Sequence, residues 1–157
     1  MADRANPKSY VRRISNFLRR PLRDQWLFVK AYLLLGISRL AIKTVTFERL
    51  ARYLGASKTE TPTEVPAHHL FEAQRVGRII RAASRYTPWK SNCFPQAIAA
   101  KYLLHTSGIN STLYLGATFK KNKSTEMEAH AWLRCGSIYV TGGELHSQFG
   151  VVGIFSG

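Results

Sequence analysis

Cys93 lies in the segment S-N-C-F-P-Q-A-I-A-A, at the point where an apolar helical pattern begins. Pro95 falls in the first turn of that helix, where the missing N–H of a proline costs nothing. A cysteine at a helix N-terminus meets the positive end of the helix dipole and unpaired backbone N–H groups, and both favour the thiolate that attacks carbonyl groups. The sequence therefore predicts a nucleophile at Cys93. The alternative is a small buried thiol with a packing role only.

His130 lies in the segment E-A-H-A-W-L-R, which has the alternation of a strand. Ala131 and Leu133 are predicted on one face of this strand, with His130 and Trp132 on the other. On a strand packed against the helix of Cys93, the imidazole could take the thiol proton and later return it to the leaving amine. A helix-capping cysteine followed by strands that carry a histidine is the order of papain and transglutaminase architectures. Alone, a strand histidine is more often an ordinary polar residue.

A cysteine–histidine pair usually relies on other groups that orient the imidazole and stabilise the oxyanion. Glu144 is the only acidic residue after His130, and a carboxylate at a strand end can hold the imidazole tautomer. Thr141 or a backbone carbonyl could do the same. The backbone N–H of Cys93 is the natural oxyanion donor. The remaining candidates for a second donor or a pocket wall are Asn92, Gln96, Trp89 and Trp132, with an ordinary structural role favoured for the first three.

Residues 1–55 are predicted to form a basic helical N-terminal section. Pro21 stops or kinks a first helix, because proline cannot continue the backbone hydrogen bonding. Asp24 is a plausible N-cap for a second helix, whose apolar residues recur at helical spacing. A third, short helix over residues 47–54 ends at Gly55, a favourable C-cap.

Residues 56–66 are polar and contain two prolines, so they are predicted to be a linker before a core over residues 67–157. The core begins with two predicted helices, one over residues 67–86 and one from Cys93 to about residue 106. Alternating patterns then predict strands over residues 111–119, 128–134, 137–141 and 150–155, with a hairpin tip at 120–125. Helices followed by an antiparallel meander indicate an α+β fold.

The chain has 157 residues and a formal net charge of +14. Such a charge predicts attraction to nucleic acid, to an anionic membrane surface, or to an acidic protein or peptide. The two cysteines can form neither a disulfide framework nor a four-thiolate zinc site within one chain. Cys135, beside Gly136 in a predicted turn, is expected to be incidental. We expect neither a cofactor nor a metal.

No segment has the pattern of a signal peptide. Residues 26–42 form the most apolar stretch, but Lys30 and Arg39 interrupt it. Its charge-free part is far shorter than the roughly 20 residues needed to cross a bilayer. We therefore expect a soluble, cytoplasmic protein.

The segment C-F-P-Q-A-I-A-A-K-Y-L-L-H-T-S-G-I-N-S-T-L-Y-L-G-A and the later A-H-A-W-L-R-C-G resemble the transglutaminase-like leader peptidases of lasso-peptide biosynthesis, the B2 proteins. The close match runs from Cys93 to Gly143, and residues 26–55 resemble the N-terminal part of the family more loosely. The resemblance implies a papain-like or transglutaminase-like core, in which a helix capped by the cysteine packs on an antiparallel sheet. It also implies that Cys93 is the nucleophile and His130 its base.

Members of that family remove the leader from a ribosomally made precursor peptide. The resemblance therefore implies a precursor substrate and two protein partners, a small winged-helix-like leader-binding protein and an asparagine-synthetase-like cyclase. One position departs from the pattern, because many members carry an Asp about a dozen residues after the histidine. Here that position is Gly142, within Y-V-T-G-G-E. The third member of a triad is thus left to another group, such as Glu144.

Two other functions fit the same residues. A related amidase or transglutaminase would use the same thioester chemistry. A non-catalytic basic module would bind a peptide or nucleic acid, with Cys93 as a structural residue. Against nucleic acid, the aromatic residues of the basic section fall on the apolar helix face, and no known RNA- or DNA-binding motif is present. A peripheral membrane contact through a basic helix over residues 12–23 is a further interpretation of the charge.

Overall fold

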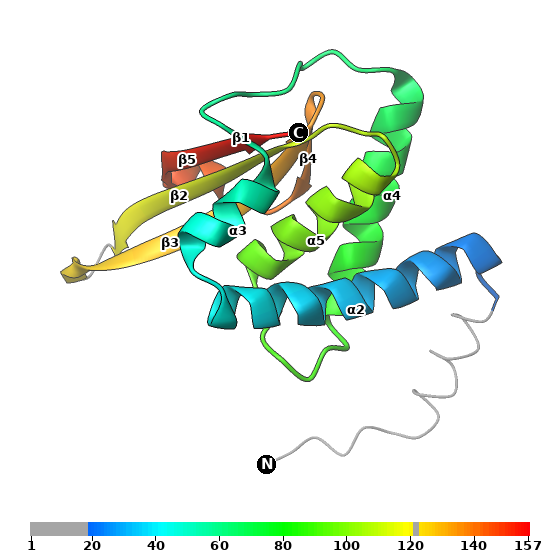
Figure 1. Ribbon diagram of the computed structural model, residues 1–157, viewed down its shortest axis with the longest axis horizontal. Helices are drawn as coiled ribbons and strands as arrows, with labels where there is room; N and C mark the ends of the chain where they lie inside the picture. Colours follow the sequence, from blue (N-terminus) through cyan, green and yellow to red (C-terminus); the bar gives the residue numbers. More distant parts are fainter. Residues whose placement is uncertain (1–18, 121–122) are drawn as a thin grey trace.

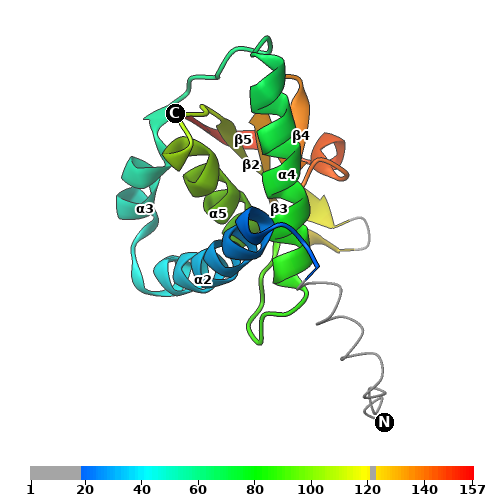
Figure 2. The ribbon, with the colours of Figure 1, turned by 90° about the vertical axis from the view of Figure 1, so that its right-hand side faces the viewer.

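The computed structural model describes residues 19–120 and 123–157, in which helices cover one side of a five-stranded antiparallel sheet (Figures 1 and 2). Its elements in chain order are α2 (Leu22–Thr44), α3 (Phe47–Leu54), β1 (Ala56–Ser57), α4 (Ala67–Ser84), α5 (Cys93–Thr106), β2 (Thr112–Lys120), β3 (Lys123–Cys135), β4 (Ile138–Thr141), the 3₁₀ turn η1 (His146–Gln148) and β5 (Gly150–Ser156). The predicted α+β class is confirmed. The helix predicted before Pro21 lies mostly outside the described residues, as does part of the predicted hairpin tip.

The helix ends follow local signals in the sequence. α3 has the predicted bounds and is followed by Gly55, whose φ of +105° is one that residues with a Cβ rarely adopt. α5 also has the predicted bounds, and Gly108, with a φ of +71°, redirects the chain toward β2. α2 begins directly after Pro21, so Asp24 lies in its first turn and is not the N-cap.

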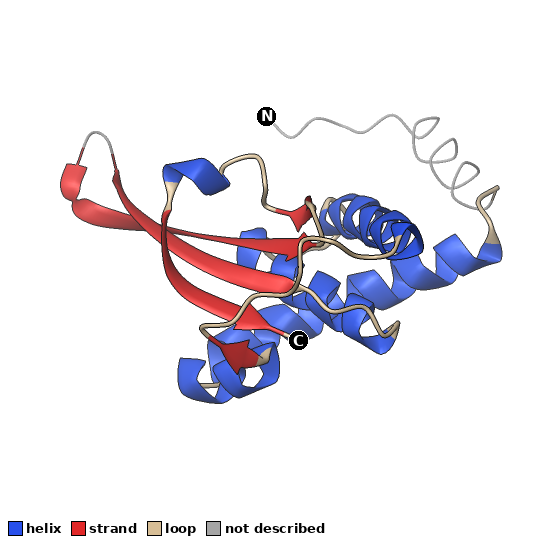
Figure 3. Ribbon diagram, turned by 90° about the horizontal axis from the view of Figure 1, so that it is seen from above, coloured by secondary structure: helices blue, strands red, loops and turns tan. Residues whose placement is uncertain are grey.

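The sheet has the strand order β1-β5-β2-β3-β4, and every neighbouring pair is antiparallel. β2, β3 and β4 form the predicted meander. β5, however, returns to the other edge of β2, so the last four strands form a Greek key (Figure 3). The predicted linker also contains a short strand, since Ala56 of β1 pairs with Ser156 of β5. The predicted simple meander is corrected in these two respects.

The hydrophobic core lies between α4, α5 and one face of the sheet. Ala131 and Leu133 supply the contribution of β3, with at most 1% of their surface exposed. α2 packs across both α4 and α5 (Figure 2). It adds Ala31 and Leu35, which are fully buried in the same cluster. The helix before the linker and the elements after it therefore share one core.

The opposite face of the sheet carries a buried polar network centred on Arg134. Its guanidinium donates to the Glu60 carboxylate at 2.9 Å, to the Thr61 carbonyl at 2.9 Å and to the Gly136 carbonyl at 2.8 Å. Its Nε donates to the Tyr114 hydroxyl at 3.0 Å, and that hydroxyl donates to Glu60 at 2.7 Å. Burial raises the pKa of the Tyr114 hydroxyl despite the neighbouring cation, so the hydroxyl stays a donor. The network fastens the linker to the sheet.

Lys101 is a buried lysine on the inner side of α5. Its Nζ donates to the carbonyls of Ser111 and Gly157, each at 2.8 Å. Burial lowers the pKa of its ammonium to about 8, because a charged group loses hydration inside the protein. The carbonyls satisfy its hydrogen bonds, but no carboxylate side chain hydrogen-bonds to its charge among the described residues.

The free energy of unfolding should rise between about pH 8 and pH 10.5, the ordinary pKa of a lysine. In this window the unfolded chain still holds the Lys101 proton that the folded chain has lost, so higher pH favours the folded state. Urea unfolding at several pH values measures this slope. Burial raises the pKa of the Cys135 thiol, which lowers the free energy of unfolding as pH rises and so opposes the effect of Lys101. The same measurement on Lys101→Met gives the contribution of all other groups, and the difference between the two curves is due to Lys101. A difference that stays constant with pH would contradict the prediction.

Candidate active site

Cys93 is the first residue of α5, and its half-buried side chain packs against the hydrophobic core. Asn92 occupies the N-cap with an extended backbone, but its side chain makes no capping hydrogen bond. The first N–H groups of an α-helix have no partner within the helix. Their positive end therefore lies beside the thiol, at the helix position that the sequence predicts.

The loop that leads into α5 is held by Trp89 and Gln96. The Trp89 ring packs on Tyr32 of α2 with ring centroids 5.3 Å apart. It also fills the space above Gly36, where an added Cβ would lie 2.9 Å from the indole. The Gln96 amide donates to the Ser91 carbonyl at 2.8 Å. Both side chains thus anchor the loop, while the buried indole N–H of Trp89 has no hydrogen-bond partner among the described residues.

The imidazole of His130 is sandwiched by aromatic rings and held by one hydrogen bond. Its centroid lies 5.9 Å from that of Trp132 and 5.0 Å from that of Phe149. Its Nε2 is 2.8 Å from the carbonyl oxygen of Gly142. Since a carbonyl only accepts hydrogen bonds, Nε2 carries the proton, and the lone pair of the neutral ring is on Nδ1. The ring is therefore held in the tautomer whose Nδ1 can accept a proton.

Gly142 supplies through its backbone what a carboxylate would supply through a side chain. Its φ is +71°, and an added Cβ would lie 2.4 Å from the Ala131 carbonyl oxygen, so an Asp does not fit here without a backbone shift. The carboxylate of Glu144, the predicted orienter, pairs with Arg81 at 3.2 Å, and a role for it at His130 stays a prediction. The carbonyl orients the ring, but unlike a carboxylate it brings no negative charge to an imidazolium.

The two predicted catalytic side chains lie on opposite sides of β3. Ala131 and Leu133 face α5 in the core, so strand alternation places His130 and Trp132 on the other face. Among the described residues, no hydrogen bond joins the thiol of Cys93 to the ring of His130. The grouping of His130 with Trp132 agrees with the sequence pattern. The sequence pattern did not specify which of the two faces meets the cysteine helix.

An aromatic column that the sequence did not reveal supports the histidine. Tyr114 stacks on Trp132 with ring centroids 5.5 Å apart and an interplanar angle of 9°. Gly116 lies opposite His130 in the β2–β3 register, and an added Cβ there would meet the Trp132 ring at 2.7 Å. The column therefore needs a glycine at this position. The glycine of L-Y-L-G-A was the available signal, since glycine inside a strand often marks a close approach.

These features, a half-buried cysteine at a helix N-terminus and an oriented histidine on an antiparallel sheet, suit thiol-based attack on a carbonyl. The sequence model described as "Transglutaminase-like superfamily" matches residues 38–153, about three quarters of the chain. The chain belongs to the transglutaminase-like superfamily. The matched region of this transglutaminase-like protein runs from the C-terminal half of α2 into β5. Members of the superfamily are typically cysteine peptidases or acyl transferases.

No curated protein and no solved structure matches this transglutaminase-like chain. Within residues 19–120 and 123–157, no three His, Cys, Asp or Glu side chains gather in a way that could hold a metal ion.

The two cysteines should react very differently with iodoacetamide in the native protein. Cys93 is half-buried at a helix end, whereas Cys135 is fully buried and burial raises the pKa of its thiol. Because the thiolate is the reactive form, Cys93 should be carboxamidomethylated while Cys135 stays unmodified until the chain unfolds. Peptide mass spectrometry after a timed quench measures both. Equal labelling of the two cysteines in the native protein would rule out this difference in access.

Proposed function

We propose that the protein is a cysteine-type leader peptidase that acts in the cytoplasm on a ribosomally made lasso-peptide precursor. Cys93 is its nucleophile and His130 its general base and acid. The observation that carries the proposal is the position of Cys93 at the N-terminus of α5 within a transglutaminase-like domain. The resemblance of the C-F-P-Q and A-H-A-W segments to the lasso-peptide peptidases supports the choice of substrate.

The reaction forms and breaks one thioester. The Sγ of Cys93 attacks the scissile carbonyl carbon, and the backbone N–H groups at the start of α5 stabilise the oxyanion. The C–N bond then breaks, and the imidazolium of His130 gives its proton to the leaving amine, the new N-terminus of the core peptide. The leader remains as a thioester on Cys93. Water, deprotonated by His130, attacks this thioester and releases the leader carboxylate and the free thiol.

Proton transfer between Cys93 and His130 requires the two side chains to approach each other more closely than they do in the structure described above. The Nδ1 of His130 has the lone pair for the task, but no hydrogen bond links it to the thiol. Catalytic hydrogen bonds are often long in free enzymes and tighten with substrate. The proposal therefore includes a rotation of the His130 side chain, or a relay through water or the substrate, once the precursor is bound.

His130→Gln separates ring orientation from proton transfer. The glutamine amide can still donate to the Gly142 carbonyl, but it cannot accept and release a proton near neutral pH. We expect acylation of Cys93 to slow by roughly 10²- to 10⁴-fold, the usual contribution of a general base, with little change in thermal stability. Rapid-quench mass spectrometry measures the rate. Cleavage at the wild-type rate would show that another group takes the proton.

The decisive experiment follows the masses of the products. The full chain is incubated with a synthetic lasso-peptide precursor that contains leader and core, with and without a leader-binding protein and a cyclase. Acid quenching should trap a leader adduct on the peptide that contains Cys93, and hydrolysis should release a leader that has gained one water. A product joined to an added amine with loss of ammonia would favour a transglutaminase. If all partners are present and no adduct and no product form, an enzymatic role is contradicted.

The rival with structural support is a non-catalytic binding module. It is favoured by the separation of Cys93 and His130 on opposite sides of β3. In that case the alkylation rate of Cys93 at pH 6 should not exceed that of a free thiol. The precursor should then bind without being cleaved.

A further inference from the structure

α2 exposes an apolar stripe along its whole length. The six side chains of the stripe, each between 41% and 81% exposed, are Leu22, Trp26, Val29, Leu33, Ile37 and Leu40. They recur at intervals of three and four residues, which places them on one side of a helix. By length and composition alone α2 is apolar enough to cross a membrane, yet only 17% of its apolar window is buried. The stripe is therefore an unpartnered surface of the described structure.

The stripe lies directly opposite the face of α2 that packs into the protein. At about 100° per residue, its centre is roughly 180° around the helix from the buried Ala31, Leu35 and Ser38. Because Ala31 and Leu35 are fixed in the core, the two faces cannot exchange. α2 is thus anchored along one side and apolar along the other, which is the geometry of a helix that lies on a surface and not of one that spans a bilayer.

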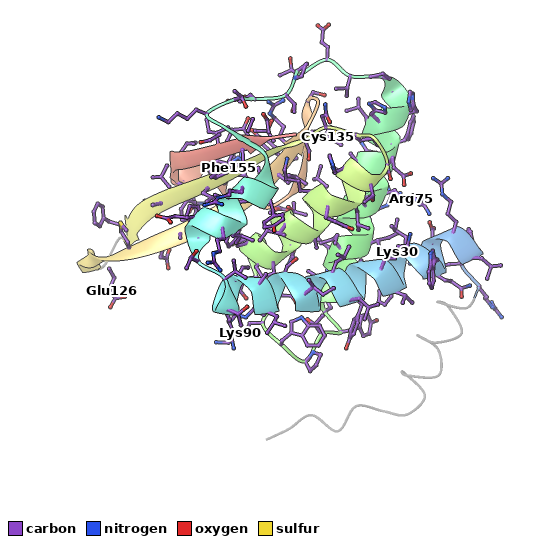
Figure 4. The ribbon with its side chains drawn as sticks, viewed as in Figure 1. Lys30, Arg75, Lys90, Glu126, Cys135 and Phe155 are labelled. Atoms are coloured by element: carbon purple, nitrogen blue, oxygen red, sulfur yellow. The ribbon has the colours of Figure 1, made fainter. Side chains whose placement is uncertain are left out.

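Basic side chains border the stripe on both sides. On the same helical projection, Arg23 and Lys30 fall along one border, and Arg39 and Lys43 along the other; Arg23 also pairs with Glu72 of α4 at 3.5 Å. Lys30, which Figure 4 shows on α2, also has its ammonium 5.8 Å from the centroid of the Trp26 ring. Arg19 and Arg20 precede the helix and are exposed. A convex apolar ridge between two rows of cations matches the boundary between acyl chains and anionic headgroups.

Asp24, the acidic residue of α2, does not add negative charge to the apolar stripe or to its basic borders. Asp24 lies on the inner side, where its carboxylate accepts from Arg75 of α4 at 2.6 Å. Within α2 the stripe and its borders therefore contain no carboxylate. An acidic protein could match the charges, but it would also need a groove that fits a straight convex ridge of six apolar side chains. The bilayer surface meets both requirements at once.

We propose that α2 docks the protein, lying flat, on anionic lipid membranes through this stripe and its basic borders. The contact uses no residue of the proposed peptidase chemistry, so it stands or fails separately from that function. It also differs from a contact through residues 12–23, because the apolar stripe of α2 supplies the binding area.

The test uses the full chain with vesicles of phosphatidylcholine, with or without phosphatidylglycerol. The wild type should sediment with the phosphatidylglycerol vesicles and be released as ionic strength rises from about 0.1 M to about 1 M. Trp26 is 63% exposed on the stripe, so lipids brominated in their acyl chains should quench it most strongly, whereas Trp132 is buried and Trp89 is half-buried beside α2. Trp26→Phe should remove most of this quenching. Quenching that persists in this variant would overturn the proposed depth and orientation.

Matched variants identify the stripe as the contact. Leu33→Gln/Ile37→Gln keeps the net charge, so its expected loss of about tenfold or more in vesicle affinity reports apolar burial. Lys30→Glu/Lys43→Glu should weaken binding to anionic vesicles to a similar degree, while Phe71→Gln/Val152→Gln, which changes two equally exposed apolar residues away from α2, should bind as the wild type does. Wild-type binding by Leu33→Gln/Ile37→Gln, or no sedimentation of the wild type, would overturn the proposal.

Discussion

Cys93→Ala should abolish turnover of the precursor, with kcat/KM falling by about 10⁴-fold or more, because no thioester can form without the thiol. The fold should survive, since Cys93 is only half-buried at the start of α5 and a smaller side chain there leaves the helix intact. Cleavage followed by mass spectrometry gives the rate, and circular dichroism with thermal unfolding gives the state of the fold.

Cys135→Ala is the matched control within the same chain. It removes the other thiol, which is fully buried in the core, and should lower the free energy of unfolding by about 1 to 2 kcal/mol through the cavity it leaves. Turnover should remain near the wild-type rate. Loss of activity in both variants would mean that folding, and not a nucleophile, explains the effect of Cys93→Ala. Retained activity in Cys93→Ala would remove Cys93 from the mechanism.

Arg134→Ala should cause the largest loss of stability among the polar residues described above, about 2 to 3 kcal/mol, because buried carbonyls lose their donor. The side chain is 9% exposed and makes hydrogen bonds to two carbonyls, a hydroxyl and the Glu60 carboxylate. Its removal leaves the Thr61 and Gly136 carbonyls without this donor, although the hydrogen bonds between Thr61 and Thr112 still join the linker to the sheet. Urea unfolding gives the free energy.

Arg81 provides the comparison for this second prediction. It also pairs with a glutamate, Glu144, but its side chain is 48% exposed. Arg81→Ala should therefore cost no more than about 1 kcal/mol, as is usual for surface ion pairs. Arg134→Lys should recover only part of the loss, because an ammonium cannot reproduce the planar set of guanidinium donors. Similar losses for Arg81→Ala and Arg134→Ala would show that the network contributes little.

The helices could be predicted closely because their limits are local. Pro21 fixes its own φ, and Gly55 and Gly108 tolerate the positive φ at which a helix ends, so the limits of α2, α3 and α5 follow from single residues. β1 could not be predicted in the same way. Its two residues lie in a polar segment, and the bond that makes them a strand is with Ser156, about a hundred positions later. Local periodicity carries no information about such pairing.

The local features of the site could be predicted from the sequence, but the way in which α5 packs on β3 could not. Alternation correctly grouped His130 with Trp132, and the missing carboxylate at Gly142 was visible in the sequence. Which face of β3 meets α5 depends on tertiary packing. The apolar character of Ala131 and Leu133 was a usable signal, because a helix with an apolar face packs on the apolar side of a strand. The Arg134 network stayed hidden because its partners come from three separate segments.

The return of β5 to β2 has a consequence for how the chain is made. While the ribosome has delivered β2, β3 and β4 but not yet residues 150–156, one edge of β2 has no partner. An unpaired strand edge is a template for other nascent chains. The polypeptide thus passes through an aggregation-prone stage that ends only when β5 inserts between β1 and β2. Translation that stalls before Gly150 should therefore yield chains that depend on chaperones to stay in solution.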